Sequence, residues 1–372
     1  MKIMKFLFKC FFIAFLGVIS SSIPYAQETE QFSSKNTHVK YKSLITDGGH
    51  LSWSKANNKI AFDRLGEDGW FDLWTMNSDG TEEKCLTGDH PVLPDKHIGQ
   101  PAWHPSGKFM VIQAMKPHVP DYAENKCRPG AGALNDLWII TEDGTRCWKL
   151  HPVRDEVSKD SAGVLHPHFS HDGSKLFWAE RIRHNGRPFG EWILRIADFS
   201  FDETKGPTLK KIRNYNPGNL SSFFESHSFS QDDKHVLFTG NQDGPLEIYE
   251  MEVTSGNVKR LTYHSIYTWD EHAHYSPDGK KIVWMSSRDV RFEINPFYLE
   301  AEFWIMDRDG SNNRRLTWFH QPGHPHYLDL DFAVAADFDW NPDGKQIAGL
   351  IITHEPDTDK RGSGIVFLID IQ

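Results

Sequence analysis

Cysteine is scarce in this sequence, and its scarcity limits both redox chemistry and covalent cross-linking. Four cysteines occur among 372 residues, and Cys10 lies in an apolar N-terminal segment. The remaining Cys85, Cys127 and Cys147 are odd in number, so at least one stays outside any disulfide. Cys127 and Cys147 fall in one repeat and are the pair to test first, with ordinary buried thiols as the alternative. No C-x-x-C or C-x-x-C-H segment occurs, which excludes a thioredoxin-type pair and a c-type haem attachment.

Basic residues and long apolar runs are also in short supply. Lys and Arg number 41 against 51 Asp and Glu, which gives a formal net charge of -10. A nucleic-acid partner needs a basic face for its phosphates, so we expect no nucleic-acid partner. No segment after the N-terminal region approaches the roughly 20 apolar residues that a membrane helix needs. We therefore expect no membrane span in the mature chain.

Two groups of catalytic motifs are missing as well. The G-x-S-x-G segment of α/β-hydrolases does not occur, and neither does a glycine-rich phosphate-binding loop. These absences argue against a serine peptidase, a kinase or a nucleotide-dependent enzyme.

The N-terminus has the layout of an export signal. Lys2, Lys5 and Lys9 precede an apolar run over Cys10–Ile19, and small residues lead to Ala26. This order is typical of a secretory signal peptide over residues 1–26, cleaved after Ala26, with an uncleaved anchor as the alternative. We expect a short segment over 27–38 to follow, and a periplasmic or secreted protein.

The rest of the chain repeats one pattern six times. A short strand ends in an aromatic residue, and a polar turn, two apolar strands and a last short strand follow. Asp-Gly and Ser-Gly in these turns supply the positive φ that tight turns require. Six such units predict an all-β, six-bladed β-propeller. The six aromatic residues are Trp53, Trp103, Phe169, Phe229, Tyr275 and Trp340.

The sixth unit reaches the C-terminus after its third strand. Val39–Thr46 resembles the fourth strands of the other units and lies at the opposite end of the chain. We expect this strand to complete the last blade and to close the ring over residues 39–372, because closure removes an open sheet edge.

The fifth unit carries a family resemblance. Tyr-Ser-Pro-Asp-Gly-Lys-Lys-Ile-Val-Trp, followed by Trp-Ile-Met-Asp-Arg-Asp-Gly and Arg-Arg-Leu-Thr, resembles the PD40 (WD40-like) repeat of TolB-like propellers. The similarity extends over residues 40–372 and implies the TolB-like six-bladed fold. It implies no single function, because this repeat serves binding proteins, peptidase accessory domains and lyases.

Long loops gather at one end of the predicted propeller. They connect second to third strands and one blade to the next, and they are rich in His, aromatic residues and Arg. Because function usually lies on loops held by a rigid scaffold, we expect a protein segment or an acidic glycan to bind at this end. Loops that only cover the blades are the alternative. The longest of them are 116–134, 151–165, 288–300 and 318–335.

Histidine and carboxylate residues recur just before the six aromatic residues. Because the first strands run along the channel, these side chains converge from separate blades and suit a divalent metal or an acidic sugar. Histidines with purely structural roles are the alternative. The candidate binding residues are His50, Gln100, His166, His168, Glu225, Glu271, His272, His274 and Asp337.

A second resemblance concerns chemistry. The segment Gln321-Pro-Gly-His324-Pro-His326 is similar to a metal-binding segment of oligogalacturonate lyases. The resemblance implies a Mn or Ca site formed by Gln321, His324, His326 and His227, with Arg187 acting on a uronate in β-elimination. Three features depart from that family: its propeller has seven blades, it is mostly cytoplasmic, and here the insertion 327–339 follows the segment.

The sequence thus favours an extracytoplasmic, TolB-like binding or assembly module. A metal-dependent polysaccharide lyase is the alternative. A third hypothesis is a non-catalytic subunit of a periplasmic complex.

Overall fold

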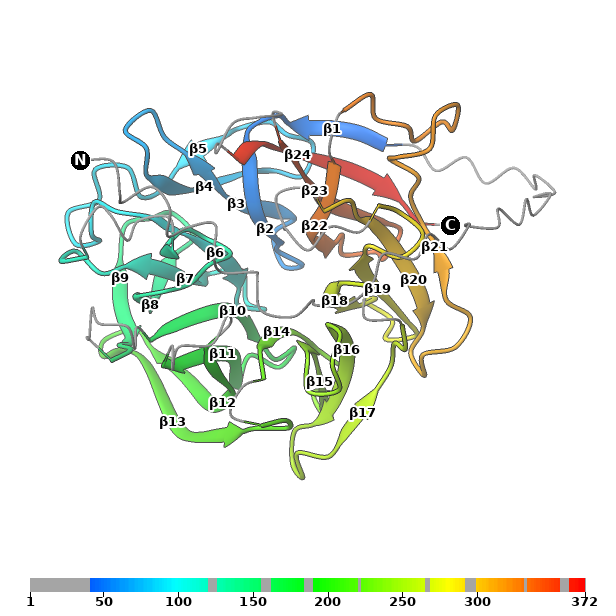
Figure 1. Cartoon of the computed structure of the whole chain (residues 1–372). Coiled ribbons are helices and arrows are strands. Elements are labelled where there is room, and N and C mark those ends of the chain that lie inside the picture. Colours follow the sequence, from blue (N-terminus) through cyan, green and yellow to red (C-terminus); the bar gives the residue numbers. More distant parts are fainter. Residues whose placement is uncertain are drawn as a thin grey trace, which may run out of the picture.

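The computed structural model is a ring of six antiparallel four-stranded sheets (Figure 1). The predicted signal peptide over 1–26 and the segment 27–38 lie outside the described residues. No helix in the described part is both long and apolar enough to cross a membrane. The described residues are 41–119, 126–154, 162–183, 190–219, 222–264, 268–291, 299–330, 333–354 and 361–371.

Each blade follows the predicted unit, with its first strand innermost and its fourth outermost. The first three blades consist of β2 (Gly48–Trp53), β3 (Lys59–Leu65), β4 (Phe71–Asn77), β5 (Lys84–Cys85); β6 (Ile98–Trp103), β7 (Phe109–Met115), β8 (Asn135–Thr141), β9 (Cys147–His151); and β10 (Gly163–Phe169), β11 (Lys175–Arg183), β12 (Glu191–Asp202), β13 (Gly206–Tyr215). The other three consist of β14 (Phe224–Phe229), β15 (His235–Gly240), β16 (Glu247–Glu252), β17 (Val258–Arg260); β18 (Asp270–Tyr275), β19 (Lys281–Ser286), β20 (Glu302–Asp307), β21 (Arg314–Arg315); and β22 (Ala333–Trp340), β23 (Gln346–His354), β24 (Arg361–Asp370), β1 (Tyr41–Ile45).

The ring closes as predicted, by an N-terminal strand that completes the sixth blade. β1 pairs antiparallel with β24, with Tyr41 opposite Ile369 and Ser43 opposite Phe367. Ile45 at the end of β1 is buried between the first and last blades, in one cluster with Trp53, Phe62 and others. The two ends of the described chain therefore hold the ring together, both by a backbone ladder and by an apolar contact.

Separate apolar clusters, rather than one central core, hold neighbouring blades together. Trp103 and Met110 of the second blade pack on Leu73 of the first, and Phe303 of the fifth packs with Phe338 of the sixth. The aromatic residues that end the first strands are buried in these clusters, which explains why an aromatic residue recurs at that position.

A Leu-Thr pair lies directly after the fourth strand in three blades, at Leu86-Thr87, Leu261-Thr262 and Leu316-Thr317. In the first blade the Leu73 N–H donates to Thr87 Oγ1 (2.9 Å), and Thr87 donates to Asp72 Oδ1 (2.7 Å). In the fifth blade Thr317 likewise accepts from the Phe303 N–H (2.9 Å) and donates to Glu302 (2.6 Å). The threonine hydroxyl thus continues the ladder where the short fourth strand has ended and satisfies a carboxylate at the start of the third strand.

The third blade has a long outer hairpin. In the structure β12 continues to Asp202 and pairs with β13, with Phe201 opposite Pro207. Phe199 packs in the core of this blade interface and Phe201 packs against it, so apolar burial extends the hairpin.

The structure has no disulfide between Cys127 and Cys147, so of the two alternatives it has the one with ordinary thiols. Both residues are thiols in the structure. Cys127 is buried with Met115 and Ala133, whereas Cys147 packs at the interface with the first blade, where its Sγ lies 3.9 Å from His90 Nδ1. The two thiols belong to different apolar clusters, and the repeat that contains both does not bring them together.

The closing strand yields a stability prediction. Ile45→Ala removes a buried side chain between the first and last blades and should lower the free energy of unfolding by about 2–4 kcal/mol. Ser43→Ala, at an exposed position of the same strand, should change it by no more than about 0.5 kcal/mol. Urea unfolding of both variants measures the difference, and equal stability would show that β1 does not hold the ring closed.

Candidate functional site

All six innermost strands contain an irregularity in a similar place, within the five residues before the aromatic residue that closes the strand. In β10 the pairing with β11 shifts between Leu165 and His168, and in β18 the pairing with β19 shifts between Glu271 and His274. The same shift occurs in β2, β6, β14 and β22. A bulge of this kind bends a strand and re-aims its side chains.

Three bulge residues have a backbone conformation that is uncommon outside glycine. The φ angles are 48° at Gln100, 44° at His166 and 53° at His272, one in each of three blades. Side chains with a Cβ adopt positive φ at a cost, and such residues concentrate at functional sites.

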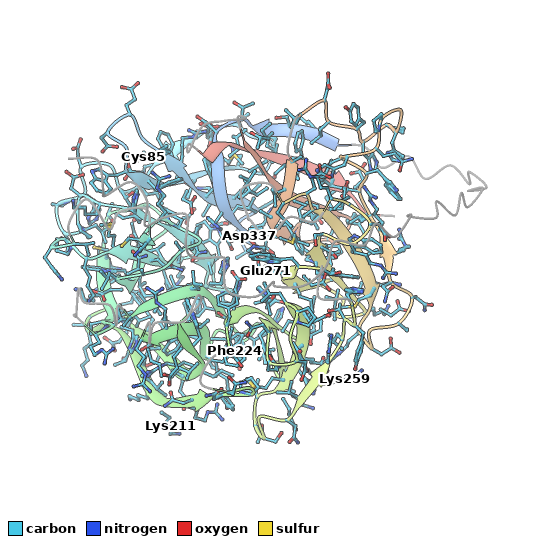
Figure 2. The ribbon with its side chains drawn as sticks, viewed as in Figure 1. Cys85, Lys211, Phe224, Lys259, Glu271 and Asp337 are labelled. Carbon is cyan, nitrogen blue, oxygen red and sulfur yellow. The ribbon has the colours of Figure 1, made fainter. Side chains whose placement is uncertain are left out.

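The bulges direct side chains onto the propeller axis. The rings of His166 in the third blade and His272 in the fifth have centroids 5.1 Å apart. His50 of the first blade lies 5.8 Å from His166, and His168 lies 5.2 Å from His274. Blades that are not neighbours contact each other only across the channel, so these residues form its lining. Figure 2 shows Glu271 and Asp337 near the centre of the ring, whereas Lys211 and Lys259 lie at its edge.

The tightest part of the channel surrounds His166. Its Nε2 lies 2.6 Å from Glu225 Oε1 and 2.8 Å from Gln100 Nε2. His272 faces two carboxyl groups, with Nε2 3.9 Å from Glu271 and Nδ1 3.8 Å from Asp337. The ligand atoms of His166, Glu225 and His272 all lie within 4.8 Å of one another, and all three residues are buried.

A second layer lies nearer the closing aromatic residues. His227 is fully buried, and its Nε2 hydrogen-bonds Thr239 Oγ1 at 2.8 Å. Its ring lies 6.4 Å from that of His274, whose Nδ1 is 3.9 Å from Asp339. The predicted column is therefore two connected layers of imidazoles and carboxyl groups inside the channel rather than a ring on its rim.

Burial determines the charge of this region. It lowers the pKa of His168 and of His272 to about 3, and those of His166, His227 and His274 well below their usual value. Neutral imidazoles keep a lone pair on one nitrogen, which is the form that binds metal ions. Burial also raises the pKa of Asp337 to about 7 and that of Glu225 above its usual value, and burial together with the Glu225 charge raises that of Glu271 further.

Asp63 positions the bulges of two blades, and sequence reasoning missed it. This fully buried carboxylate in β3 accepts the backbone N–H of His50 at 3.1 Å and that of Gln100 at 3.0 Å. It also lies 3.3 Å from His50 Nδ1. The sequence does contain a signal for this residue, because Asp63 is an isolated carboxylate inside an apolar strand.

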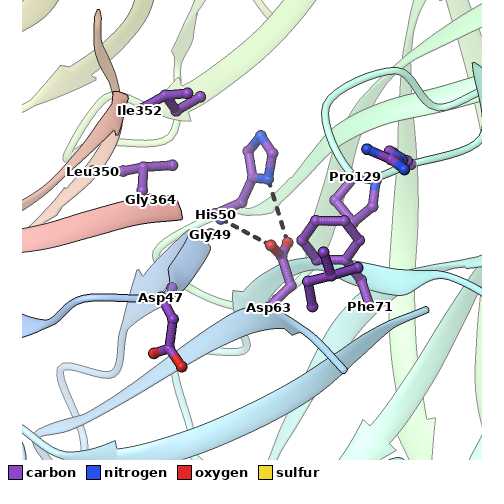
Figure 3. A pocket seen from close by; sticks show the side chains of 12 residues that line it. Asp47, Gly49, His50, Asp63, Phe71, Pro129, Leu350, Ile352 and Gly364 are labelled. Carbon is purple, nitrogen blue, oxygen red and sulfur yellow. Dashed lines mark hydrogen bonds and ion pairs between the residues drawn. The ribbon is translucent and has the colours of Figure 1, made fainter. Parts of the chain in front are cut away.

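A pocket at the long-loop end is bordered by the channel residue His50 (Figure 3). This pocket of about 210 Å³ lies where β2 begins, β3 ends and β4 begins, so loops predicted to bind surround it. His50 and Asp63 form its polar side, Arg128 comes from the second blade, and Leu350 comes from the sixth. At the other end a pocket of about 420 Å³ is bordered by His168, His274 and the short turns.

The metal residues implied by the lyase resemblance fall into two places. His324 and His326 lie together, with ring centroids 4.6 Å apart, and His324 stacks on Trp318 at 4.7 Å. Gln321 belongs to the same turn, since its carbonyl accepts the His324 N–H at 3.1 Å. His227 instead contacts the channel histidines, and Arg187 lies outside the described residues.

A second group of possible ligands was also not foreseen. The ligand atoms of Glu247, His264 and Asp270 lie within 4.8 Å of one another. Glu247, however, already accepts from Arg260 Nη2 at 2.6 Å and from the His264 N–H at 2.8 Å. This group is the fourth-blade version of the structural carboxylate that Asp72 and Glu302 supply at the start of the third strands of the first and fifth blades.

Comparison with known protein sequences gives only a partial match. No family model matches the chain. The uncharacterized protein Atu1656 of Agrobacterium fabrum is 33% identical over 110 residues, which are 28% of this chain and only 33% of that protein. The chain thus matches about a third of the length of that relative.

Solved structures match over most of the chain at low identity. A protein described as TolB from Agrobacterium tumefaciens has a TM-score of 0.54 and 14% identity, covering 90% of this chain and 98% of that one. TolB from Acinetobacter baumannii has a TM-score of 0.51 and 16% identity, covering 89% and 65%. These similarities confirm the TolB-like propeller fold and show the fold alone. An oligogalacturonate lyase in complex with manganese has a TM-score of 0.48 and 14% identity, covering 92% of this chain and 95% of that one.

His97, near the long-loop pocket, yields a pH prediction. Its ring lies 4.8 Å from that of Trp70, and its Nδ1 accepts the Phe71 N–H at 3.2 Å. Burial lowers the pKa of His97 to about 4, and the charges of Arg128 and Lys96 act in the same direction, with a smaller opposing effect from Asp68. Between about pH 6.5 and 4 the unfolded chain therefore binds a proton that the folded chain does not, so stability should fall as pH falls through this window.

The measurement compares urea unfolding of the wild type and His97→Gln over that range. The wild-type free energy should fall more steeply, by up to about 1.4 kcal/mol per pH unit, because one additional proton is involved. Other buried histidines contribute equally to both proteins and cancel in the difference. Parallel curves for the two proteins would contradict the assignment.

Proposed function

We propose that this protein is an extracytoplasmic binding or assembly module that holds a protein segment or an acidic glycan at the long-loop mouth of its channel. The observation that carries the proposal is the pocket above His50, formed by the first, second and sixth blades. A ligand seated there contacts three blades at once, as expected where a rigid ring presents loops for recognition.

The lining of this pocket indicates the chemistry of the ligand. Leu65, which is 48% exposed, and Phe71 give it an apolar wall, whereas His50 and the Arg128 guanidinium give it a polar one. Gly130 lets the second-blade loop pass over His50, because a Cβ at this residue would lie 2.9 Å from His50 Nε2. At about 210 Å³ the pocket is smaller than most small-molecule sites. It suits one side chain or one acidic sugar ring of a longer ligand.

The proposed location rests on the sequence. The predicted signal peptide over residues 1–26 directs the chain to the periplasm or outside the cell. The TolB-like fold is compatible with that location.

Site-specific photocrosslinking tests which mouth binds the ligand. A photoreactive residue at Leu65 lies at the long-loop mouth, and one at the exposed Lys55 lies in a short turn beside the opposite pocket. In the cells that make the protein, Leu65 should give a discrete adduct that an added Arg128→Glu substitution weakens. Adducts from Lys55 with none from Leu65 would place binding at the opposite face.

A metal-dependent lyase is the second candidate, and the buried imidazole and carboxyl groups of the channel favour it. β-Elimination from a uronate needs a cation to acidify the C5 proton and a base to remove it. Incubating the purified protein with oligogalacturonate and Mn²⁺ distinguishes the two functions. The binding module predicts no unsaturated product absorbing in the ultraviolet, whereas turnover that His227→Ala removes would establish the lyase.

A further inference from the structure

We propose that His166, Glu225 and His272 form a site for one divalent first-row transition-metal ion on the propeller axis. Two imidazoles and one carboxylate are a ligand set of Zn²⁺ sites that keep a position open for a further ligand. The site shares no residue with the metal set that the lyase resemblance implied, and it selects three of the channel residues that the sequence offered for a metal or an acidic sugar. It also does not depend on the proposed function, since an ion here can be structural, catalytic or part of ligand recognition.

The geometry requires little movement to accept an ion. The three ligand atoms lie within 4.8 Å of one another, and around a tetrahedral Zn²⁺ they would lie about 3.4 Å apart. His166 and His272 come from the bulges of β10 and β18, and Glu225 lies just before the bulge of β14, so three separate blades hold them. Small side-chain rotations therefore suffice, and the rigid ring fixes the backbone.

His166 Nε2 has two polar neighbours that it cannot satisfy at the same time without a bound ion. The Gln100 amide is oriented by the His166 N–H, which donates to its Oε1 at 3.3 Å and leaves Gln100 Nε2 facing the imidazole. His166 Nε2 therefore meets an amide N–H donor on one side and Glu225 Oε1 on the other. One imidazole nitrogen either donates one proton or accepts one, so it cannot satisfy both neighbours. A cation between His166 and Glu225 satisfies the nitrogen lone pair and the carboxylate together.

His272 supplies a second, independent observation. Its Nδ1 is buried and, among the residues that the structure describes, has no hydrogen-bond partner. A buried polar atom in this state costs about 1–3 kcal/mol. Asp337 lies 3.8 Å from Nδ1, close enough to accept its proton after a small shift. That contact would direct the Nε2 lone pair to the ion, as carboxylates do for metal-bound histidines.

The surrounding charge also favours a cation. Glu225 and Asp337 are buried, and Glu271 lies beside His272 at 3.9 Å. Several carboxyl groups in one buried space are unfavourable as anions unless a positive charge accompanies them. A divalent ion provides that charge where three blades meet.

Titration of tag-free mature protein, freed of metal by a chelator, tests the site with Zn²⁺ as the probe. Isothermal titration calorimetry should give one ion per chain, and thermal unfolding should shift upward with Zn²⁺. Glu225→Gln preserves volume and should weaken Zn²⁺ binding by more than about 100-fold, because loss of an outer-shell partner alone costs about 10–100-fold. His272→Ala should act similarly.

Two matched controls keep the result interpretable. The first is His168→Gln. His168 is another histidine of β10 and lies at the other end of the bulge, so this variant should bind Zn²⁺ like the wild type. The double variant His324→Ala, His326→Ala removes the alternative pair and should also bind normally. Circular dichroism verifies that each variant folds.

The proposal is overturned if the folded wild type binds no Zn²⁺, or if Glu225→Gln binds as tightly as the wild type. Binding that disappears only with His324 and His326 would likewise overturn it and would assign the ion to the sixth-blade loop. None of these outcomes depends on the crosslinking at Leu65, so failure of the metal site and failure of the binding function are distinguishable.

Discussion

The structure depends on hydrogen bonds that join the innermost strands of adjacent blades. Ser52 of the first blade accepts the N–H of Trp103 at 3.2 Å, and Ser228 of the fourth accepts that of Tyr275 at 3.0 Å. Asp339 of the sixth accepts that of Trp53 at 2.8 Å, across the closure of the ring. In each case the side chain of the residue before one closing aromatic accepts the backbone N–H of the closing aromatic residue in the next blade. These contacts align the inner strands that they join. Because every bulge lies within the five residues before its aromatic residue, the bulges fall at similar levels of the channel.

Similar residue types have opposite environments in two parts of the molecule. At the start of the third strands, carboxylates such as Glu302 are buried but satisfied by Arg315, Thr317 and His320. In the channel, Glu225 meets an imidazole that already faces an amide donor. The first arrangement is complete without a ligand and stabilises the blade. In the second, one imidazole nitrogen faces both an amide donor and a carboxylate, a conflict that a bound cation would resolve. This difference separates a structural cluster from a candidate site better than residue identity does.

Much of the fold was predictable from sequence because it depends on local chemistry. The closing aromatic residues, the turn glycines and the apolar strands indicate six units, and the structure has six four-stranded blades. The borrowed strand followed from the missing fourth strand of the last unit. The extension of β12 was not predictable, because it depends on the packing of Phe199 and Phe201 on a neighbouring blade. The candidate site was predictable only as a set of residues. That His166 meets His272 across the axis depends on bulge geometry and positive φ, which periodicity does not record.

The central claim is that the bulges of separate blades converge on one cation site in the channel. Anomalous diffraction from crystals of the protein grown with Zn²⁺, recorded on both sides of the zinc absorption edge, tests it most directly. The account predicts one strong peak on the propeller axis, bonded to His166, Glu225 and His272. A channel without a peak, or a peak only beside His324 and His326, would contradict it.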